Sequence, residues 1–213
     1  MTSAPKSSSV TALFVLVGFI AVSAGLIFAA TRVPEQPAIP GLLWPDPPVL
    51  SSFSLQGSDG ARIDQDRLKG RWTLLFFGFT NCPDVCPTTL AVLKQVAAQL
   101  AEDPLFKRQG QVLFISLDPE RDTPEQMGKY VHYFNPGFLA ATGDGPALDA
   151  VTVPLGVIRA KVADASGGYT IDHTASIFLI DPQLRVLGKF GMPHTATAIS
   201  DGFRAISNFG ASR

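Results

Sequence analysis

The 213-residue sequence contains only two cysteines and three histidines, and it lacks an excess of charge of either sign. Its 17 basic and 18 acidic residues give a net charge of -1. A protein that binds nucleic acid needs a basic surface to neutralise phosphates, so we do not expect nucleic-acid binding. A chain of this length closes a hydrophobic core without a disulfide, so its two cysteines need another explanation than stability.

Charge is also absent from Val10 to Ala30, a run of 21 residues near the N-terminus. A helix of that length, at about 1.5 Å per residue, spans the hydrocarbon core of a bilayer, which is about 30 Å thick. We expect a transmembrane anchor at residues 10–30, preceded by a cytoplasmic tail at residues 1–9. The alternative is a cleaved signal peptide, although its apolar region is normally only about 7–15 residues long.

Prolines cluster directly after this run, where six of the sixteen residues from Val33 to Pro48 are proline. Such a composition favours extended, polyproline-like chain over packed structure. The sequence therefore predicts a semi-rigid spacer at residues 31–48 and a single folded domain at residues 49–213.

The first half of this domain shows two strand–helix units. Trp72–Gly78 and Val112–Leu117 are almost wholly apolar, as is typical of strands buried on both faces. A helical pattern follows each of them, first at Thr88–Ala101 and then after Pro124, where Thr123 is the expected N-cap.

The ends of the domain complete the pattern. Turn residues at Gly57–Gly60 predict an opening β-hairpin, and Ala175–Ile180 and Leu184–Phe190 predict two strands before a helix from Thr195. This order resembles an α/β, thioredoxin-like sheet with flanking helices. Residues 143–168 carry no clear pattern.

Cys82 and Cys86 lie directly after the first buried strand. Open α/β sheets bind ligands at the carboxyl ends of their strands, and the N-terminus of the next helix stabilises a thiolate. We therefore expect reactive thiols. Because each cysteine precedes a proline, we also expect a turn at Pro83–Val85 and a regular helix only from about Pro87.

Two thiolates are suited to metal binding and to disulfide exchange alike. The presence or absence of a third metal ligand therefore distinguishes the two functions. His132 is predicted in mid-helix and His194 in a turn, where surface histidines are common. His173 directly precedes a predicted strand, and in a thioredoxin-like sheet that loop faces the cysteine turn.

Thioredoxins carry a cis-proline in this loop, whereas the present sequence has no proline between Pro154 and Pro182. A histidine in place of that proline favours metal binding. Two cysteines and one histidine suit Cu(I) and Zn²⁺ alike, so the spacing leaves the metal open.

Four blocks in order along the chain resemble the Sco/SenC family of copper proteins: Phe77–Pro87, Phe114–Pro124, Asp172–His173 and Asp181–Pro182. The resemblance covers about residues 53–209 and implies a copper ion bound by Cys82, Cys86 and His173. It also implies a metallochaperone that assists assembly of the copper site in cytochrome c oxidase. Asn81 differs from the histidine that many relatives carry there.

The resemblance further implies an inner-membrane, single-pass protein with its domain in the periplasm, or in the intermembrane space of a mitochondrion. Its expected partner is the oxidase subunit with the copper site or another copper chaperone. The alternative function is that of an enzyme, a thiol-disulfide oxidoreductase that reduces the cysteines of that site; a peroxidase is a weaker alternative. Asp84 and Asp118 are candidates for supporting the ligands or for capping turns.

Overall fold

The structure is a computed structural model that describes residues 7–31, 38–163 and 167–211. It divides the chain into two units, Met1–Gln36 and Pro37–Arg213. Of the predicted N-terminal tail and spacer, residues 1–6 and 32–37 lie outside the described residues.

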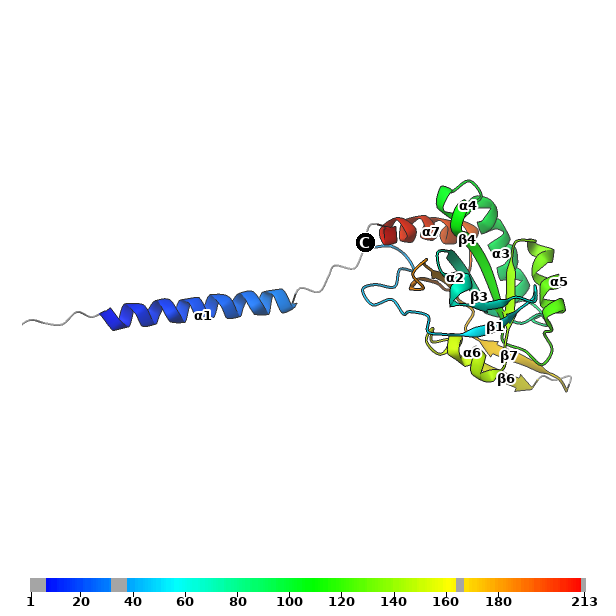
Figure 1. Ribbon diagram of the computed structural model, residues 1–213, viewed down its shortest axis with the longest axis horizontal. Coiled ribbons are helices and arrows are strands. Elements are labelled where there is room, and N and C mark those ends of the chain that lie inside the picture. Colours follow the sequence, from blue (N-terminus) through cyan, green and yellow to red (C-terminus); the bar gives the residue numbers. More distant parts are fainter. Residues whose placement is uncertain (1–6, 32–37, 164–166, 212–213) are drawn as a thin grey trace, which may run out of the picture. The chain divides into compact units, whose positions relative to one another are not determined.

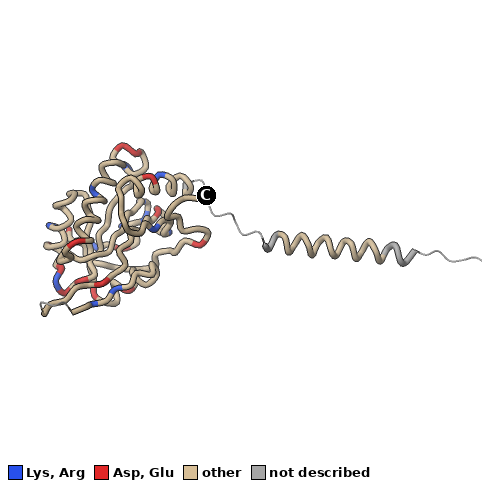
Figure 2. Tube along the Cα trace, turned by 180° about the vertical axis from the view of Figure 1, so that it is seen from behind, with Lys and Arg blue, Asp and Glu red and all other residues tan. Residues whose placement is uncertain are grey.

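The first unit contains one helix, α1, at Ser7–Thr31 (Figure 1). Its sequence includes no charged residue, and the charges of the described chain belong to the second unit (Figure 2). Among the residues that the structure describes, no helix is both long enough and apolar enough to cross a membrane. The transmembrane anchor at residues 10–30 therefore stays a prediction.

The second unit is built on a seven-stranded sheet with the order β2-β1-β5-β4-β3-β8-β9. Parallel pairing joins β3 to β4 and β4 to β5, and the remaining neighbours are antiparallel. The strands of the sheet are β1 (Ser54–Gly57), β2 (Arg62–Asp64), β3 (Trp72–Gly78), β4 (Gly110–Ser116), β5 (Leu139–Thr142), β8 (Ile177–Ile180) and β9 (Val186–Phe190).

The central strand β3 is buried along its whole length, as its apolar sequence predicts. It pairs with β4 on one side and β8 on the other, so its carboxyl end lies in the middle of the sheet edge. Ligand sites in open α/β sheets lie at this kind of position.

Within residues 38–163 and 167–211, six helices accompany the sheet and two further strands form a separate hairpin. Helix α3 contacts both α5 and α7. The helices are α2 (Gln65–Leu68), α3 (Val85–Gln99), α4 (Pro104–Gln109), α5 (Pro124–Phe134), α6 (Gly145–Thr152) and α7 (Ala196–Ala211), and the hairpin strands are β6 (Arg159–Ala163) and β7 (Tyr169–His173).

The predicted α/β, thioredoxin-like arrangement is confirmed, including the opening hairpin, the two strand–helix units and the final strands and helix. Thr123 caps α5 as predicted, and Gln126 completes a capping box. The stretch without a clear pattern forms α6 and β6, and Asp144 caps α6 through the Ala147 N–H at 2.9 Å.

Residues 38–50, which we call the edge segment, differ from the extended spacer that the prolines predict. They run along the outer edge of β9, where Leu43 N–H donates to Leu187 at 2.8 Å and Lys189 N–H donates to Gly41 at 2.8 Å. Prolines fit at a sheet edge because a segment there needs few backbone donors. Trp44 adds an edge-to-face contact with Phe209, so the folded unit begins before residue 49.

Candidate metal centre

The two thiols lie where the sequence predicts them, at the carboxyl end of β3. Cys82 follows that strand in a turn, and Cys86 lies in the first turn of α3. The Cys86 N–H points at the Cys82 sulfur, with 3.4 Å between the two atoms, and no disulfide joins the cysteines.

Helix α3 begins at Val85 rather than near Pro87, so this prediction is corrected by two residues. The residue before a proline usually avoids helical conformation, yet Cys86 is helical. The proline costs no hydrogen bond here because the first N–H groups of a helix have no partner within it. Cys86 thereby gains a fixed place on the first helical turn.

Cys86 is completely buried, whereas Cys82 is partly exposed. Gly78 at the end of β3 makes room for the buried thiol: a Cβ atom there would lie 2.8 Å from the Cys86 sulfur and 2.8 Å from the Phe114 ring. Real Cβ contacts are longer, so any larger residue at position 78 would displace the sulfur. Gly78, at the end of β3, therefore leaves the space that the Cys86 sulfur occupies.

Burial and hydrogen bonding give the two thiols opposite acidities. The side-chain hydrogen bond from the Cys86 thiol lowers the pKa of Cys82 from 9.0 to about 5, against the effect of burial and with help from the backbone N–H groups of Asp84 and Cys86. The same hydrogen bond, together with burial, raises the pKa of Cys86. Cys82 is therefore the thiolate of the reduced pair at neutral pH, and Cys86 keeps its proton.

His173, the last residue of β7, faces this pair as the sequence predicts. Its Nε2 atom lies 3.9 Å from the Cys86 sulfur, and its Nδ1 atom lies 3.1 Å from the Thr174 carbonyl oxygen. A carbonyl oxygen can only accept a hydrogen bond, so Nδ1 carries an N–H, and Nε2 is the ring nitrogen that faces the Cys86 sulfur. A metal-ligating histidine commonly donates its other ring N–H in this way.

The rings of Phe76 and Phe79 contact the imidazole edge to face, with centroids 6.3 and 6.2 Å away. In front of it, a groove of about 230 Å³ is lined by both turn and hairpin residues, including Cys82 and His173. The groove opens the site to solvent on the side of the thiolate.

The three predicted ligands thus come together in two close pairs, Cys82 with Cys86 and Cys86 with His173. Within the part of the chain that the structure describes, no cluster of three or more His, Cys, Asp or Glu side chains is arranged closely enough to hold a metal ion. The donor set itself, two thiols and an imidazole, is of the kind that soft and borderline metal ions accept.

The other two histidines lie apart from the thiols. His132 is exposed on α5. His194 is half-buried and shares a hydrogen bond with the Thr89 hydroxyl at 3.1 Å, and burial lowers its pKa, which keeps it neutral.

The two predicted supporting aspartates have different surroundings. Asp84 precedes α3 and lines the groove, and its side chain accepts a long hydrogen bond of 3.5 Å from the Thr88 hydroxyl. Asp118 is buried after β4, where it pairs with Arg121 and accepts a hydrogen bond of 2.8 Å from the Tyr169 hydroxyl. It thus contacts the strand of His173 and not the thiols.

Sequence reasoning missed Asp122, which is 1% exposed. Its carboxylate accepts hydrogen bonds from the Thr80 N–H at 2.8 Å and from the Ser116 hydroxyl at 2.5 Å. Thr80 stands two residues before Cys82, so Asp122 fixes the start of the cysteine turn. Asp122 could have been predicted from its position, because it follows the buried strand β4 in the same polar segment as Asp118.

The family model described as SCO1/SenC matches residues 45–208. The chain belongs to the SCO1/SenC family. The match includes both cysteines, His173 and the edge segment from Pro45, and it agrees with the resemblance that the four sequence blocks carry. Both hairpin strands and the whole sheet also lie within it.

Curated SCO1/SenC relatives are about one third identical to this chain. A protein of Stutzerimonas stutzeri that is named for copper binding is 34% identical over 152 residues, which make up 71% of this chain and 74% of that protein. The mitochondrial SCO2 homologue of Bos taurus is 37% identical over 153 residues, 71% of this chain and 57% of that protein.

Solved structures of SCO1/SenC proteins share the fold. The copper-bound ScoI of Arabidopsis thaliana superimposes with a TM-score of 0.70 at 31% identity, covering 76% of this chain and 99% of that one. The copper-bound ScoI of Bradyrhizobium japonicum does so with a TM-score of 0.65 at 34% identity, again over 76% and 99%. Copper, the metal that the sequence resemblance implies, is thus the metal of these relatives.

Proposed function

We propose that this protein is a copper metallochaperone that holds its cargo with Cys82, Cys86 and His173. The observation that carries the proposal is the presence of two close donor pairs that share Cys86: Cys82 on a turn with Cys86 on a helix, and Cys86 with His173 on a hairpin. Thiolate and imidazole donors suit copper, and the relatives that are named for copper or solved with it support this metal.

The acidities suggest how each residue acts. Cys82 offers a ready thiolate at the groove, so it is the first ligand to meet Cu(I). Cys86 joins by giving up its proton to solvent, so that one proton leaves as the second Cu–S bond forms. His173 adds its Nε2 nitrogen, and the hydrogen bond from Nδ1–H to the Thr174 carbonyl keeps Nε2 directed at the metal.

The recipient is the copper site of cytochrome c oxidase or another copper chaperone. Support comes from the family, since the Sco protein BsSco is described as a member of a family of cytochrome c oxidase assembly proteins. A partly exposed thiolate at an open groove suits transfer by ligand exchange, because an incoming thiolate reaches the metal without unfolding the site.

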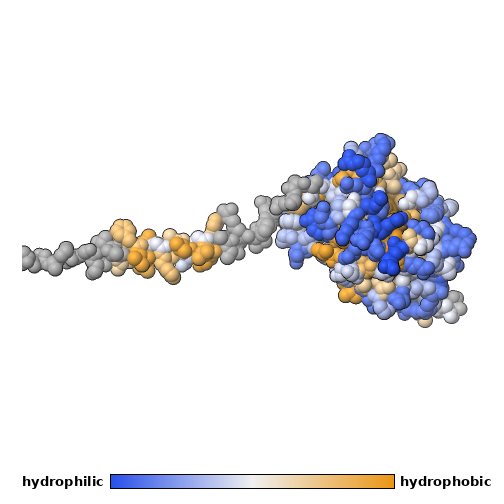
Figure 3. Space-filling view, in the orientation of Figure 1, coloured by the Kyte–Doolittle hydropathy of each residue, from blue (hydrophilic) through white to orange (hydrophobic). Residues whose placement is uncertain are grey.

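A membrane tether suits such delivery. The uncharged run Val10–Ala30 and the exposed apolar side chains of α1, from Leu13 to Phe28, support a membrane anchor (Figure 3). The inner membrane and the periplasmic side of the domain are what the family resemblance implies. Alkaline carbonate extraction of membranes tests this part: an anchored protein stays in the pellet, and a peripheral protein is released.

The second candidate function is thiol-disulfide exchange with the cysteines of the oxidase copper site. The observation that favours it is the pair of a low-pKa, accessible thiol and a neighbouring resolving thiol, which is the arrangement of disulfide reductases. Full activity of a His173→Ala variant in oxidase assembly would favour this function over copper delivery.

Competition with a Cu(I) chelator tests the copper proposal. We expect the reduced wild-type protein to bind one Cu(I), His173→Ala to bind it at least tenfold more weakly, and the Cys82→Ser, Cys86→Ser double variant to lose tight binding. His132→Ala is the matched control, because His132 is exposed on α5, and it should bind as wild type. Unchanged affinity of His173→Ala would remove His173 from the ligand set.

A further inference from the structure

The strand that carries His173 belongs to a hairpin outside the main sheet. Strands β6 and β7 pair in continuous register from Arg159 opposite His173 to Ala163 opposite Tyr169. Successive side chains of a strand point to opposite faces, so Tyr169, Ile171 and His173 share one face of β7. Ile171 is buried, so this face looks toward the body of the domain.

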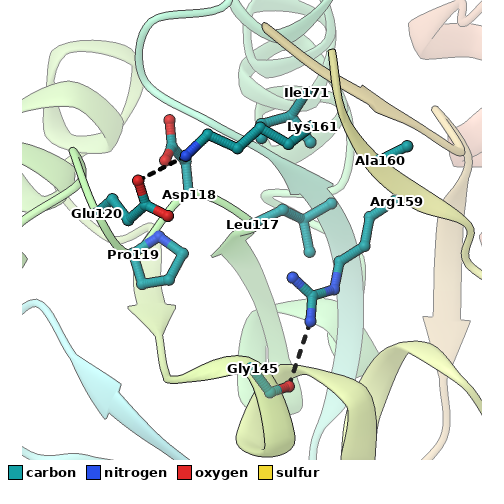
Figure 4. A pocket seen from close by; sticks show the side chains of 9 residues that line it. All are labelled: Leu117, Asp118, Pro119, Glu120, Gly145, Arg159, Ala160, Lys161 and Ile171. Atoms are coloured by element: carbon teal, nitrogen blue, oxygen red, sulfur yellow. Dashed lines mark hydrogen bonds and ion pairs between the residues drawn. The ribbon is translucent and has the colours of Figure 1, made fainter. Parts of the chain in front are cut away.

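Residues of the hairpin and of the body together line a hollow of about 210 Å³ (Figure 4). Two ion pairs cross this hollow or its rim: Lys161 contacts Glu120 at 2.7 Å, and Arg159 contacts Asp149 at 2.8 Å. The side chains of Glu120 and Asp149 are 67% and 58% exposed, and such surface pairs contribute little to the stability of a structure. These two ion pairs therefore constrain the position of the hairpin only weakly, and Arg159 adds a hydrogen bond of 3.2 Å to the Gly145 carbonyl (Figure 4).

Tyr169 is the first residue of β7, and His173 is the last. Tyr169 makes several polar contacts between the hairpin and the body. Its hydroxyl donates to the buried carboxylate of Asp118 at 2.8 Å, and its carbonyl accepts from Arg121 at 2.9 Å. The Arg121 guanidinium and the Lys161 ammonium each lie 3.7 Å from the centre of its ring. Contacts of a cation with an aromatic face are attractive, so the ring is fixed as well as the hydroxyl.

The body residues in these contacts belong to one short loop, residues 117–123, between β4 and α5. At its other end the same loop holds the cysteine turn, because Asp122 accepts hydrogen bonds from the N–H and hydroxyl of Thr80. Asp118 and Asp122 are 2% and 1% exposed. The 117–123 loop therefore contacts both chain segments that carry the proposed ligands.

We infer that Tyr169 is a positioning residue for His173: its contacts with Asp118 and Arg121 set the place of the imidazole relative to the thiols. The inference rests on the proposed function, in which His173 is a copper ligand. The paired strands carry the constraint from Tyr169 to His173. The base of the hairpin is closed by Thr174 N–H, which donates to Ile158 at 3.1 Å.

The test is a double-mutant cycle of Tyr169→Leu with His173→Ala, read out as Cu(I) affinity by chelator competition on the full-length reduced protein. Loss of residues that support a metal ligand typically weakens binding about 10- to 100-fold. We expect Tyr169→Leu to weaken binding at least tenfold when His173 is present and less than twofold in the His173→Ala background. Tyr133→Leu is the matched control, since Tyr133 is 82% exposed on α5, and it should change neither affinity.

An equal loss in both backgrounds, or no loss in either, would overturn the inference, because Tyr169 would then act through the thiols or not at all. Wild-type affinity of His173→Ala alone is a different outcome, which removes the proposed ligand set and the inference with it. A spectroscopic readout accompanies the cycle: the nitrogen hyperfine coupling in the EPR spectrum of the Cu(II)-loaded protein should weaken in Tyr169→Leu.

Tyr169→Phe serves if the leucine variant does not fold. It keeps the ring and both cations in place and removes only the hydroxyl that donates to Asp118. We expect a smaller loss, about threefold, again only when His173 is present. A loss that persists in the His173→Ala background would count against the inference here as well.

Discussion

At the scale of single residues, the two thiols of the site differ in exposure and acidity although they stand four positions apart. Cys82 is partly exposed and ionised at neutral pH, and Cys86 is buried and protonated. In the proposed copper site, the exposed thiolate of Cys82 would meet the metal first and the buried Cys86 would bind second.

The asymmetry predicts the pH dependence of alkylation in the reduced, metal-free protein. A lowered pKa means that Cys82 is still a thiolate below neutral pH and loses reactivity only as the pH falls through about 5. Iodoacetamide labelling, followed by peptide mass spectrometry, should therefore modify Cys82 with a midpoint near pH 5 and leave Cys86 unmodified.

Cys86→Ala provides the control for this experiment, because the hydrogen bond from Cys86 is the largest cause of the low pKa of Cys82. In this variant the midpoint should move up toward the ordinary cysteine value of about 8.5. A wild-type midpoint near 8 or 9, or preferential labelling of Cys86, would contradict the assignment of the thiolate.

At the scale of secondary-structure elements, the 117–123 loop joins the cysteine turn to the domain through Asp122. Three donors, the Thr80 N–H, the Thr80 hydroxyl and the Ser116 hydroxyl, converge on this carboxylate. Asp122→Ala leaves these donors buried without an acceptor, at about 1–3 kcal/mol for each unsatisfied group. We expect a loss of about 3 kcal/mol in the free energy of unfolding, measured by denaturant titration.

Asp144→Ala is a suitable comparison, since Asp144 also accepts a backbone hydrogen bond but is exposed at the N-cap of α6. Removal of such a cap typically costs about 1 kcal/mol. Equal losses in the two variants would mean that Asp122 acts only as a local cap and does not support the cysteine turn.

The elements that could be predicted from sequence are those whose side chains repeat a simple burial pattern. Strand β3 is buried at every position, and its apolar run marked both of its ends. The first strand of the His173 hairpin has four exposed residues in five and shows no such pattern. Its partner β7 pairs only with β6, so local sequence contained little to indicate either strand.

The proposed ligands of the candidate site could be predicted from sequence, but the residues that support them could not. Cysteine spacing and the position of His173 before a strand pointed to the ligands. Asp122 and Tyr169 were missed because their importance comes from contacts with residues 42 and 51 positions away, which no local pattern reveals.

At the scale of the whole molecule, the edge segment extends the domain and covers the outer strand of the sheet. Exposed sheet edges invite pairing with other chains, so the edge segment protects the β9 edge from such pairing. The aromatic contact of Trp44 with Phe209 fastens this segment to α7.

Trp44→Ala tests whether the edge segment contributes to folding. Loss of the ring and its partly buried surface should lower the free energy of unfolding by about 2 kcal/mol, followed by near-UV circular dichroism during denaturation. Val49→Ala in the same segment should cost less than about 0.5 kcal/mol, because Val49 is 57% exposed. No difference between the variants would show that the segment is only loosely attached.

The most direct measurement of the central claim is X-ray absorption spectroscopy of the reduced protein loaded with one equivalent of Cu(I). Binding by Cys82, Cys86 and His173 predicts two sulfur ligands and one nitrogen ligand at the metal, and it predicts that His173→Ala loses the nitrogen while both sulfurs remain. A copper environment that is the same in wild type and His173→Ala would contradict the account.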